Sequence, residues 1–209
     1  MSTTPRRPAQ LDAEQIESIE GESDVAYNSE LAHTSAQALI PMGRNHLAED
    51  LEAVKRIIAL VDDEGVDVLA EAWVKSPENT LPGILWRGYL LREWIRREGN
   101  EVRSRYLAAD SALRAKGEDG VLKANMTPKP GTVRQEWDAV LAGTFEGDFT
   151  DVLVDSARLM DVLASEQSGW ILNDSHPLAH EVTRRSKALA QTSVEFRDAA
   201  ALAAEGLLE

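Results

Sequence analysis

The stretch LPGILWRGYLLREWIRREGNEVRSRY (residues 81–106) decides the fold that we expect for this chain of 209 residues. Successive residues of an α-helix turn by about 100°, which places the apolar side chains of residues 84–95 around more than half of the helix. Such a broad apolar surface is typical of a helix at the centre of a core. We therefore expect Trp86, Leu90 and Trp94 to pack in the interior.

Arg87 falls inside this apolar surface, between Leu91 and Trp94 on the helical wheel. A buried guanidinium needs a carboxylate or several carbonyl groups as partners. We therefore expect either an internal ion pair between Arg87 and an acidic residue, or an arginine at the rim whose charged end reaches solvent. On the polar side of the same helix, Glu93 and Arg97 are spaced for an ion pair.

Apolar residues recur at helical spacing before this stretch as well. A short helix is expected over residues 11–19, and another from Tyr27 to the region of Pro41. Gly65 separates the next two helices, and Thr80 is placed to cap the helix that begins the quoted stretch. The clearest apolar seam comprises Leu47, Leu51, Val54, Ile58 and Val61.

Beyond residue 98, we expect Asn100 to cap a helix, Thr132 and Gln135 to form a capping box, and Gly143 to end the helix that follows. Further helices are expected over residues 149–163 and 178–203. The segment KGEDGVLKANMTPKPG (residues 116–131) contains three glycines and two prolines, and it is the best candidate for a linker.

These patterns predict an all-α protein, a bundle of about eight helices with mostly short connections. Residues 1–10 are expected to be a disordered leader. Residues 11–209 are expected to form a single helical domain, or two subdomains divided by the 116–131 linker. All five tryptophans are expected to fill core space: Trp73, Trp86, Trp94, Trp137 and Trp170.

The composition is that of an acidic protein, with 22 Lys and Arg against 36 Asp and Glu and a net charge of −14. This charge argues against attraction of the whole surface to nucleic acid or to anionic lipid. The absence of cysteine excludes disulfides and thiolate metal sites. No apolar run approaches the length of a membrane span, so the cytoplasm is the expected location, and no cofactor is expected.

One region is locally basic. Residues 87–116 contain eight positive and four negative side chains, so this segment carries +4 and the rest of the chain −18. Such a patch inside a negative field favours an acidic protein partner, or the acidic surface of a second copy, over nucleic acid. The interaction candidates are Arg87, Arg92, Arg96, Arg97, Arg103 and Arg105.

Three histidines provide the first alternative. His176 and His180 stand four residues apart in SHPLAHE, and His46 lies at the start of another expected helix. Histidines one helical turn apart can share a metal ion. This set resembles the three-histidine metal site of DinB-like four-helix bundles, which would imply a metal-dependent enzyme. The other interpretation is surface histidines, because His176 and His180 lie opposite the apolar stripe of their helix.

Four carboxylates provide the second alternative: Glu49, Glu52, Glu64 and Asp67. Their spacing is similar to the paired-carboxylate signature of all-α, magnesium-dependent nucleotide pyrophosphatases of the MazG type. That resemblance implies Mg²⁺ held by these oxygens against a triphosphate. The other interpretation is a solvated acidic face, which 36 acidic residues make common.

Taken together, the residues favour a non-enzymatic helical protein that acts through protein–protein contacts or self-association. A metal-dependent enzyme that uses either the histidines or the carboxylates is the alternative. The chain contains no glycine-rich phosphate-binding loop, no GxSxG and no HExxH motif.

Overall fold

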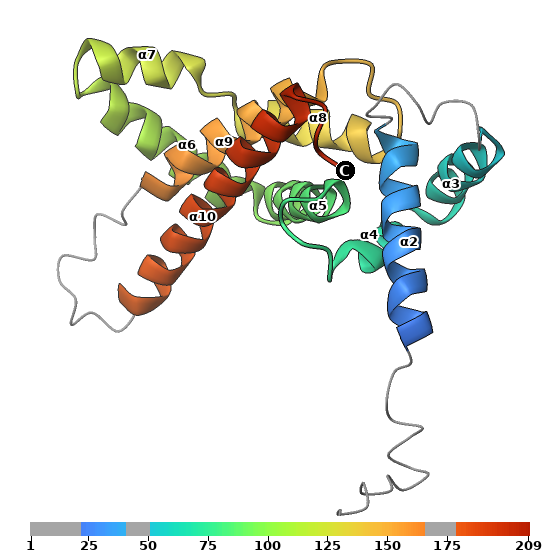
Figure 1. Ribbon diagram of the computed structural model, residues 1–209. Helices are drawn as coiled ribbons and strands as arrows, with labels where there is room; N and C mark the ends of the chain where they lie inside the picture. Colours follow the sequence, from blue (N-terminus) through green and yellow to red (C-terminus); the bar gives the residue numbers. More distant parts are fainter. Residues whose placement is uncertain (1–21, 41–50, 166–178) are drawn as a thin grey trace, which may run out of the picture.

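Helices make up the computed structural model, which describes residues 22–40, 51–165 and 179–209 (Figure 1). The all-α prediction is confirmed, because these residues contain helices and no strand. The described helices are α2 (Glu22–Leu39), α3 (Leu51–Glu64), α4 (Asp67–Trp73), α5 (Leu81–Arg97), α6 (Gly99–Arg114), α7 (Glu118–Met126), α8 (Pro130–Leu141), α9 (Phe149–Ser165) and α10 (Ala179–Ala204). None of them is long and apolar enough to cross a membrane.

Three predicted helix boundaries are confirmed. The Thr80 hydroxyl accepts a hydrogen bond from the Gly83 amide at 3.3 Å and so caps α5. Gly65 separates α3 from α4 with φ at +86°, and Gly143 follows α8 with φ at +66°. Both glycines occupy the left-handed region, which residues with a Cβ rarely adopt, and this explains where the helices stop.

Other boundaries differ from the prediction. Asn100 does not cap α6, because that helix already begins at Gly99. Thr132 does not cap α8 either, because Pro130 starts the helix and needs no amide partner there. The 116–131 segment contains α7, so most of the predicted linker is helical. The division into two subdomains stays a prediction, and residues 1–10 lie outside the described residues.

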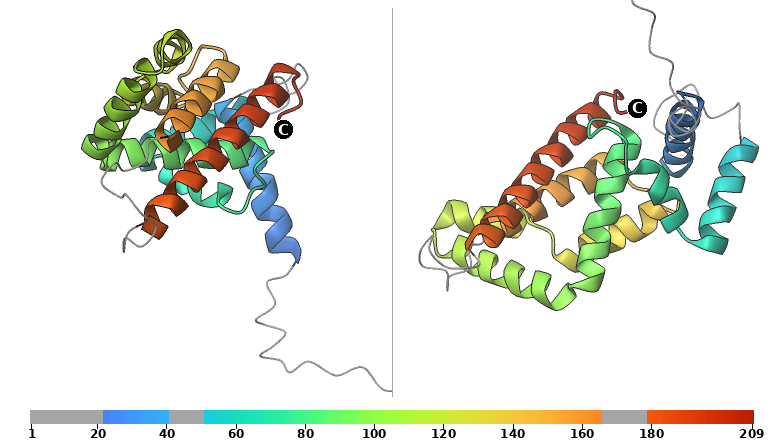
Figure 2. Two further views of the ribbon diagram at one scale, coloured as in Figure 1. Left: turned by 90° about the vertical axis from the view of Figure 1, so that its left-hand side faces the viewer. Right: turned by 90° about the horizontal axis from the view of Figure 1, so that it is seen from below.

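Helix α5 lies at the centre of the molecule, in contact with α2, α4, α8 and α10 (Figures 1 and 2). Helices α9 and α10 pair along their length on one side of it. Helices α6 and α7 form an arm at the opposite end from α2, where a small apolar cluster joins both helices to Val162 of α9. The side chains of Leu81, Ile84 and Leu85 at the start of α5 are fully buried, as expected for a central helix.

Two buried tryptophans connect helices across the core in the same way. The Trp73 indole of α4 donates to the Ser35 hydroxyl of α2 at 3.0 Å, and the Trp137 indole of α8 donates to the Ser156 hydroxyl of α9 at 2.8 Å. All four side chains are buried, so each indole has a partner that water cannot replace. Gly88 of α5 lies directly against the Trp137 ring, since a Cβ there would come within 2.1 Å of a ring carbon.

The other tryptophans depart from the prediction. The side chain of Leu90 is 46% exposed, so its predicted interior position is wrong. Trp86 and Trp94 are only half-buried at the edge of the core, where Trp86 stacks on Tyr89 with ring centroids 5.5 Å apart. The Trp94 indole donates to Glu98 at 2.8 Å. The helical wheel predicted a wider buried surface because it shows the direction in which each side chain of α5 points. It does not show which side of the helix a neighbouring helix covers. Trp170 lies outside the described residues.

Candidate binding surfaces

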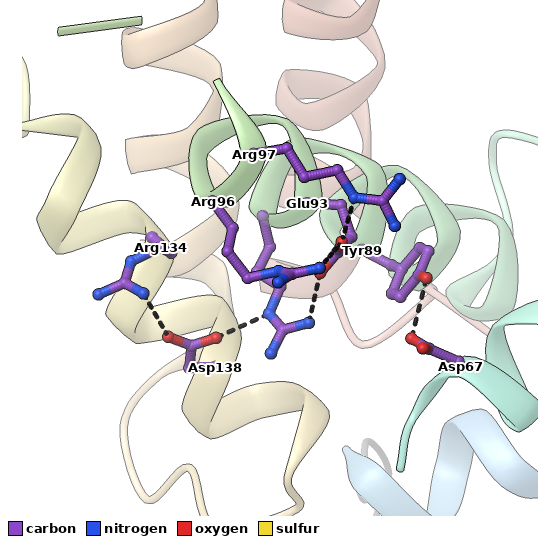
Figure 3. A network of polar contacts seen from close by, with 8 residues as sticks. Asp67, Tyr89, Glu93, Arg96, Arg97, Arg134 and Asp138 are labelled. Atoms are coloured by element: carbon purple, nitrogen blue, oxygen red, sulfur yellow. Dashed lines mark hydrogen bonds and ion pairs between the residues drawn. The ribbon is translucent and has the colours of Figure 1, made fainter. Parts of the chain in front are cut away.

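The most organised polar group of the described residues surrounds Glu93 on α5 (Figure 3). This residue is 7% exposed, and both of its carboxylate oxygens accept two hydrogen bonds. One oxygen accepts from Arg92 Nη1 at 2.7 Å and from Arg96 Nε at 2.9 Å. The other accepts from Arg96 Nη2 at 2.7 Å and from Arg97 Nε at 2.9 Å. The predicted Glu93–Arg97 pair is confirmed, and two further arginines join it.

Hydrogen bonding governs the ionisation of Glu93. The hydrogen bonds from Arg96 are the main reason that the pKa of this carboxyl falls from its ordinary 4.5 to about 2. Burial acts in the opposite direction, and the hydrogen bond from Arg97 lowers the pKa further. Glu93 therefore stays ionised at neutral pH and holds three guanidinium groups in place.

The network extends from α5 to two neighbouring helices. Arg92 Nε donates to Asp138 of α8 at 2.7 Å, and Arg134 lies 3.8 Å from the other oxygen of Asp138. On the opposite side, the Tyr89 hydroxyl donates to Asp67 of α4 at 2.9 Å. Burial and this hydrogen bond raise the pKa of Tyr89, which keeps the hydroxyl protonated as a donor. We refer to these six residues as the arginine cluster: Glu93, Asp138, Arg92, Arg96, Arg97 and Arg134.

Arg87 confirms the internal ion pair expected from its place on the wheel. Its Nε donates to Glu195 of α10, and both side chains are largely buried. Its Nη1 also donates to the Gly83 carbonyl at 3.0 Å, and Glu78 lies 3.6 Å from Nη2. The guanidinium is thus satisfied inside the fold, where it ties α5 to α10.

The remaining interaction candidates differ from one another. Arg105 of α6 donates to the Leu163 carbonyl at 2.7 Å and to the Ser186 hydroxyl at 3.0 Å, so it too joins helices. Arg103 is exposed and has no hydrogen bond or ion pair with any described residue. Arg96 and Arg97 are 51% and 69% exposed. The interaction role of the six arginines stays a prediction, and the structure gives Arg87 and Arg105 internal partners.

A groove between α2 and α4 was not predicted. It has a volume of about 830 Å³ and is lined by five residues of α2 between positions 27 and 33 and by residues of α4 and the turn after it. Four of its lining side chains are apolar and exposed: Tyr27, Leu31, Val68 and Val74. The sequence does contain a signal, because Tyr27 and Leu31 are one helical turn apart, but this spacing is also that of a core stripe.

A smaller cavity of about 340 Å³ lies between α7, α9 and α10. Its walls include Leu122, Met126, Val154 and Ala157. The cations on its rim have acidic partners. Lys123 lies 2.7 Å and Arg197 3.6 Å from Asp161, and Arg158 lies 3.2 Å from Asp155. The walls are thus apolar, and the charges around them are balanced.

The two enzyme alternatives are largely outside the described residues. His46 and His176 are not described, and His180 lies in α10 without a described side chain. Glu49 is not described either, and Glu52 lies in α3 without a described side chain. Among the residues that are described, no group of three or more His, Asp or Glu could hold a metal ion.

The other half of the carboxylate set is described. Glu64 ends α3, Asp67 begins α4, and both side chains are exposed. Asp67 already accepts the hydrogen bond from Tyr89. The convergence of either set on a metal ion therefore stays a prediction.

Comparisons of the chain with protein-family models, with curated proteins and with solved structures find no match. Function must therefore be argued from the surfaces described above.

Proposed function

We propose that this protein is a non-enzymatic cytoplasmic protein that acts through self-association, and that the groove between α2 and α4 binds a second copy of the chain. The observation that supports this proposal is the gathering of four exposed apolar side chains in one groove. Exposed apolar side chains scattered singly are normal, but a contiguous group marks an interaction site.

The position of α2 favours a second copy as the occupant. The N-terminal end of this helix protrudes beyond α4 in Figures 1 and 2, and the Tyr27 side chain there is 66% exposed. The helix that protrudes at its N-terminal end thus also forms one wall of the groove. A two-fold arrangement can thus bury α2 of each copy against the groove of the other, which is how symmetric dimers form.

The charges at the groove suit this arrangement. Glu71 and Lys75 both line it, so two copies related by a two-fold axis can place opposite charges against each other. Over longer distances, two chains of net charge −14 repel each other. Apolar contact must overcome that repulsion, so the association is expected to be weak at low salt and to strengthen when salt screens the charges.

Sedimentation equilibrium over a wide range of protein concentration tests the proposal. Val68→Glu adds a charge inside the groove at an exposed position, and we expect it to weaken self-association at least about tenfold. Leu107→Glu on α6 is the matched control, because it adds the same charge at an exposed leucine far from the groove. We expect that variant to associate like the wild type.

Circular dichroism establishes that both variants are folded. A wild type that stays monomeric at every concentration would overturn the proposal, and so would equal weakening in the two variants. Purely electrostatic repulsion predicts that equal weakening, because both variants carry the same added charge.

A further inference from the structure

We propose that Arg96 and Arg97, held in place by Glu93, form a binding site for an acidic segment of a protein partner. The inference rests on the proposed function only in that both involve protein contacts. It concerns the arginine cluster on α5, whereas self-association concerns the groove, so each can fail without the other.

Several hydrogen-bond donors of Arg96 and Arg97 remain available. A guanidinium has five N–H groups. Arg97 uses only its Nε toward Glu93, so both of its Nη groups are without a partner among the described residues. Arg96 uses Nε and Nη2, which leaves Nη1 available. Because the two side chains are 51% and 69% exposed, these donors face solvent.

The remaining donors of Arg97 have the geometry that a carboxylate requires. The two Nη groups of an arginine form a planar fork that matches the two oxygens of a carboxylate. A free surface arginine loses much conformational freedom when it binds, and this loss reduces affinity. Here, Glu93 already fixes the Nε end of Arg97 and one edge of Arg96. Less freedom is lost on binding, so these arginines are better prepared than an unsupported one such as Arg103.

The arginine cluster has a small excess of positive charge. The arginine cluster has four positive and two negative side chains, and the nearby Asp67 reduces the excess to a single positive charge. An acidic segment is repelled by the chain as a whole, but salt limits that repulsion to about 8 Å at physiological ionic strength. Binding must therefore come from short-range bidentate contacts with a few carboxylates. A long polyphosphate backbone would have to approach a chain of net charge −14 over a larger area.

Fluorescence anisotropy with a labelled oligoglutamate peptide tests the inference, with the matching oligoglutamine peptide and a single-stranded DNA oligonucleotide as comparison probes. We expect the wild type to bind oligoglutamate and to bind neither comparison probe as tightly. Arg97→Gln is expected to weaken binding at least about tenfold. Arg103→Gln removes the same charge from the neighbouring helix and is expected to change the affinity by less than about twofold.

Two further variants separate positioning from charge. Arg97→Lys keeps the charge but loses the fork, and we expect it to bind nearly as weakly as Arg97→Gln. Glu93→Gln makes the cluster more positive, so it should strengthen binding if charge alone matters. We expect it to weaken binding, because Glu93 is a positioning residue for both arginines.

Three results would overturn the inference: equal losses in Arg97→Gln and Arg103→Gln, tighter binding by Glu93→Gln, or preferential binding of the oligonucleotide. Val68→Glu is measured in parallel and should leave oligoglutamate binding unchanged. A variant that loses self-association but still binds the peptide would show that only the groove is affected. A variant that loses peptide binding but still self-associates would show that only the arginine cluster is affected.

Discussion

The groove between α2 and α4 and the arginine cluster on α5 are opposite kinds of surface. In the arginine cluster, a buried carboxylate fixes one partly buried and two exposed arginines through four hydrogen bonds of 2.7–2.9 Å. In the groove, exposed apolar side chains surround a volume of about 830 Å³. The arginine cluster can recognise a pattern of charges, whereas the groove can bury apolar surface through contacts that have little directional preference.

The difference reflects how each surface is attached to the core. The arginine cluster lies on the central helix and is braced by Asp138 of α8, beside the buried contact between Gly88 and Trp137. The groove lies between α2 and α4, which are joined in the interior by the hydrogen bond from Trp73 to Ser35. Substitutions at these two attachment points should therefore affect the two surfaces separately.

The largest effect is expected from Gly88→Ala, which disturbs the packing of α5, the helix that carries the arginine cluster, on α8. The added Cβ would lie 2.1–2.4 Å from carbons of the buried Trp137 ring, so α5 and α8 must separate. We expect a loss of about 3 kcal/mol of unfolding free energy, measured by urea denaturation. Gly131→Ala in α8 is the control. Its Cβ meets nothing within 4 Å, so no loss is expected. Equal stability of the two variants would show that the contact between α5 and α8 can relax.

Ser35→Ala removes the hydrogen bond that joins α2 to α4 beneath the groove. It leaves the Trp73 indole buried without an acceptor, which should cost about 2 kcal/mol in urea denaturation. Hydrogen exchange is expected to rise in α2 and α4 and to stay slow in α9. Ser156→Ala removes the equivalent acceptor from Trp137, and it should give a similar loss with faster exchange in α8 and α9 instead. The same exchange pattern in both variants would contradict separate attachment.

A smaller effect is expected from Glu93→Gln, which should lower stability at neutral pH by about 1 kcal/mol, since two of its three arginine partners are exposed. The pKa of Glu93 is depressed to about 2 in the folded protein, so its contribution is complete above its ordinary pKa of 4.5 and is lost as pH falls toward 2. Urea denaturation at several pH values should therefore show a flatter profile for the variant between these limits.

Glu136→Gln in α8 is the matched control for Glu93→Gln. Burial, together with the charges of Asp155 and Asp151, raises the pKa of Glu136, and its Oε2 is buried without a hydrogen bond in the described part of the chain. Its ionised form is therefore less favourable in the folded than in the unfolded protein, and the substitution should leave stability unchanged or increase it. Destabilisation by both substitutions to the same extent would contradict the different roles of the two glutamates.

The sequence predicted the helices well because apolar spacing and capping residues are local signals. Thr80, Gly65 and Gly143 each act through their own backbone or that of a close neighbour, so one sequence suffices to find them. The helix α7 was missed because its glycines and the two prolines that follow it are typical of a linker. In the structure, Gly120 lies against the Leu113 carbonyl, where a Cβ would approach to 2.0 Å, so this glycine serves close packing of α6 on α7.

The surfaces depend on which helices meet, and that information is not local. Arg87 was correctly expected to pair internally because an arginine on an apolar face has few alternatives, but its partner Glu195 lies 108 residues away. Glu93 was placed on a polar arc, and only the three arginines around it make its burial favourable. Leu90 was expected in the interior, and it is exposed because no helix of the described part of the chain covers it.

The dependence of both binding events on sodium chloride concentration tests the groove proposal most directly. Sedimentation equilibrium of the wild type should show tighter self-association as salt rises, because screening removes the repulsion between two chains of net charge −14 while apolar contact persists. Oligoglutamate binding, measured in the same buffers, should weaken. Self-association that weakens in parallel with peptide binding would show that charges, and not the groove between α2 and α4, hold two copies together.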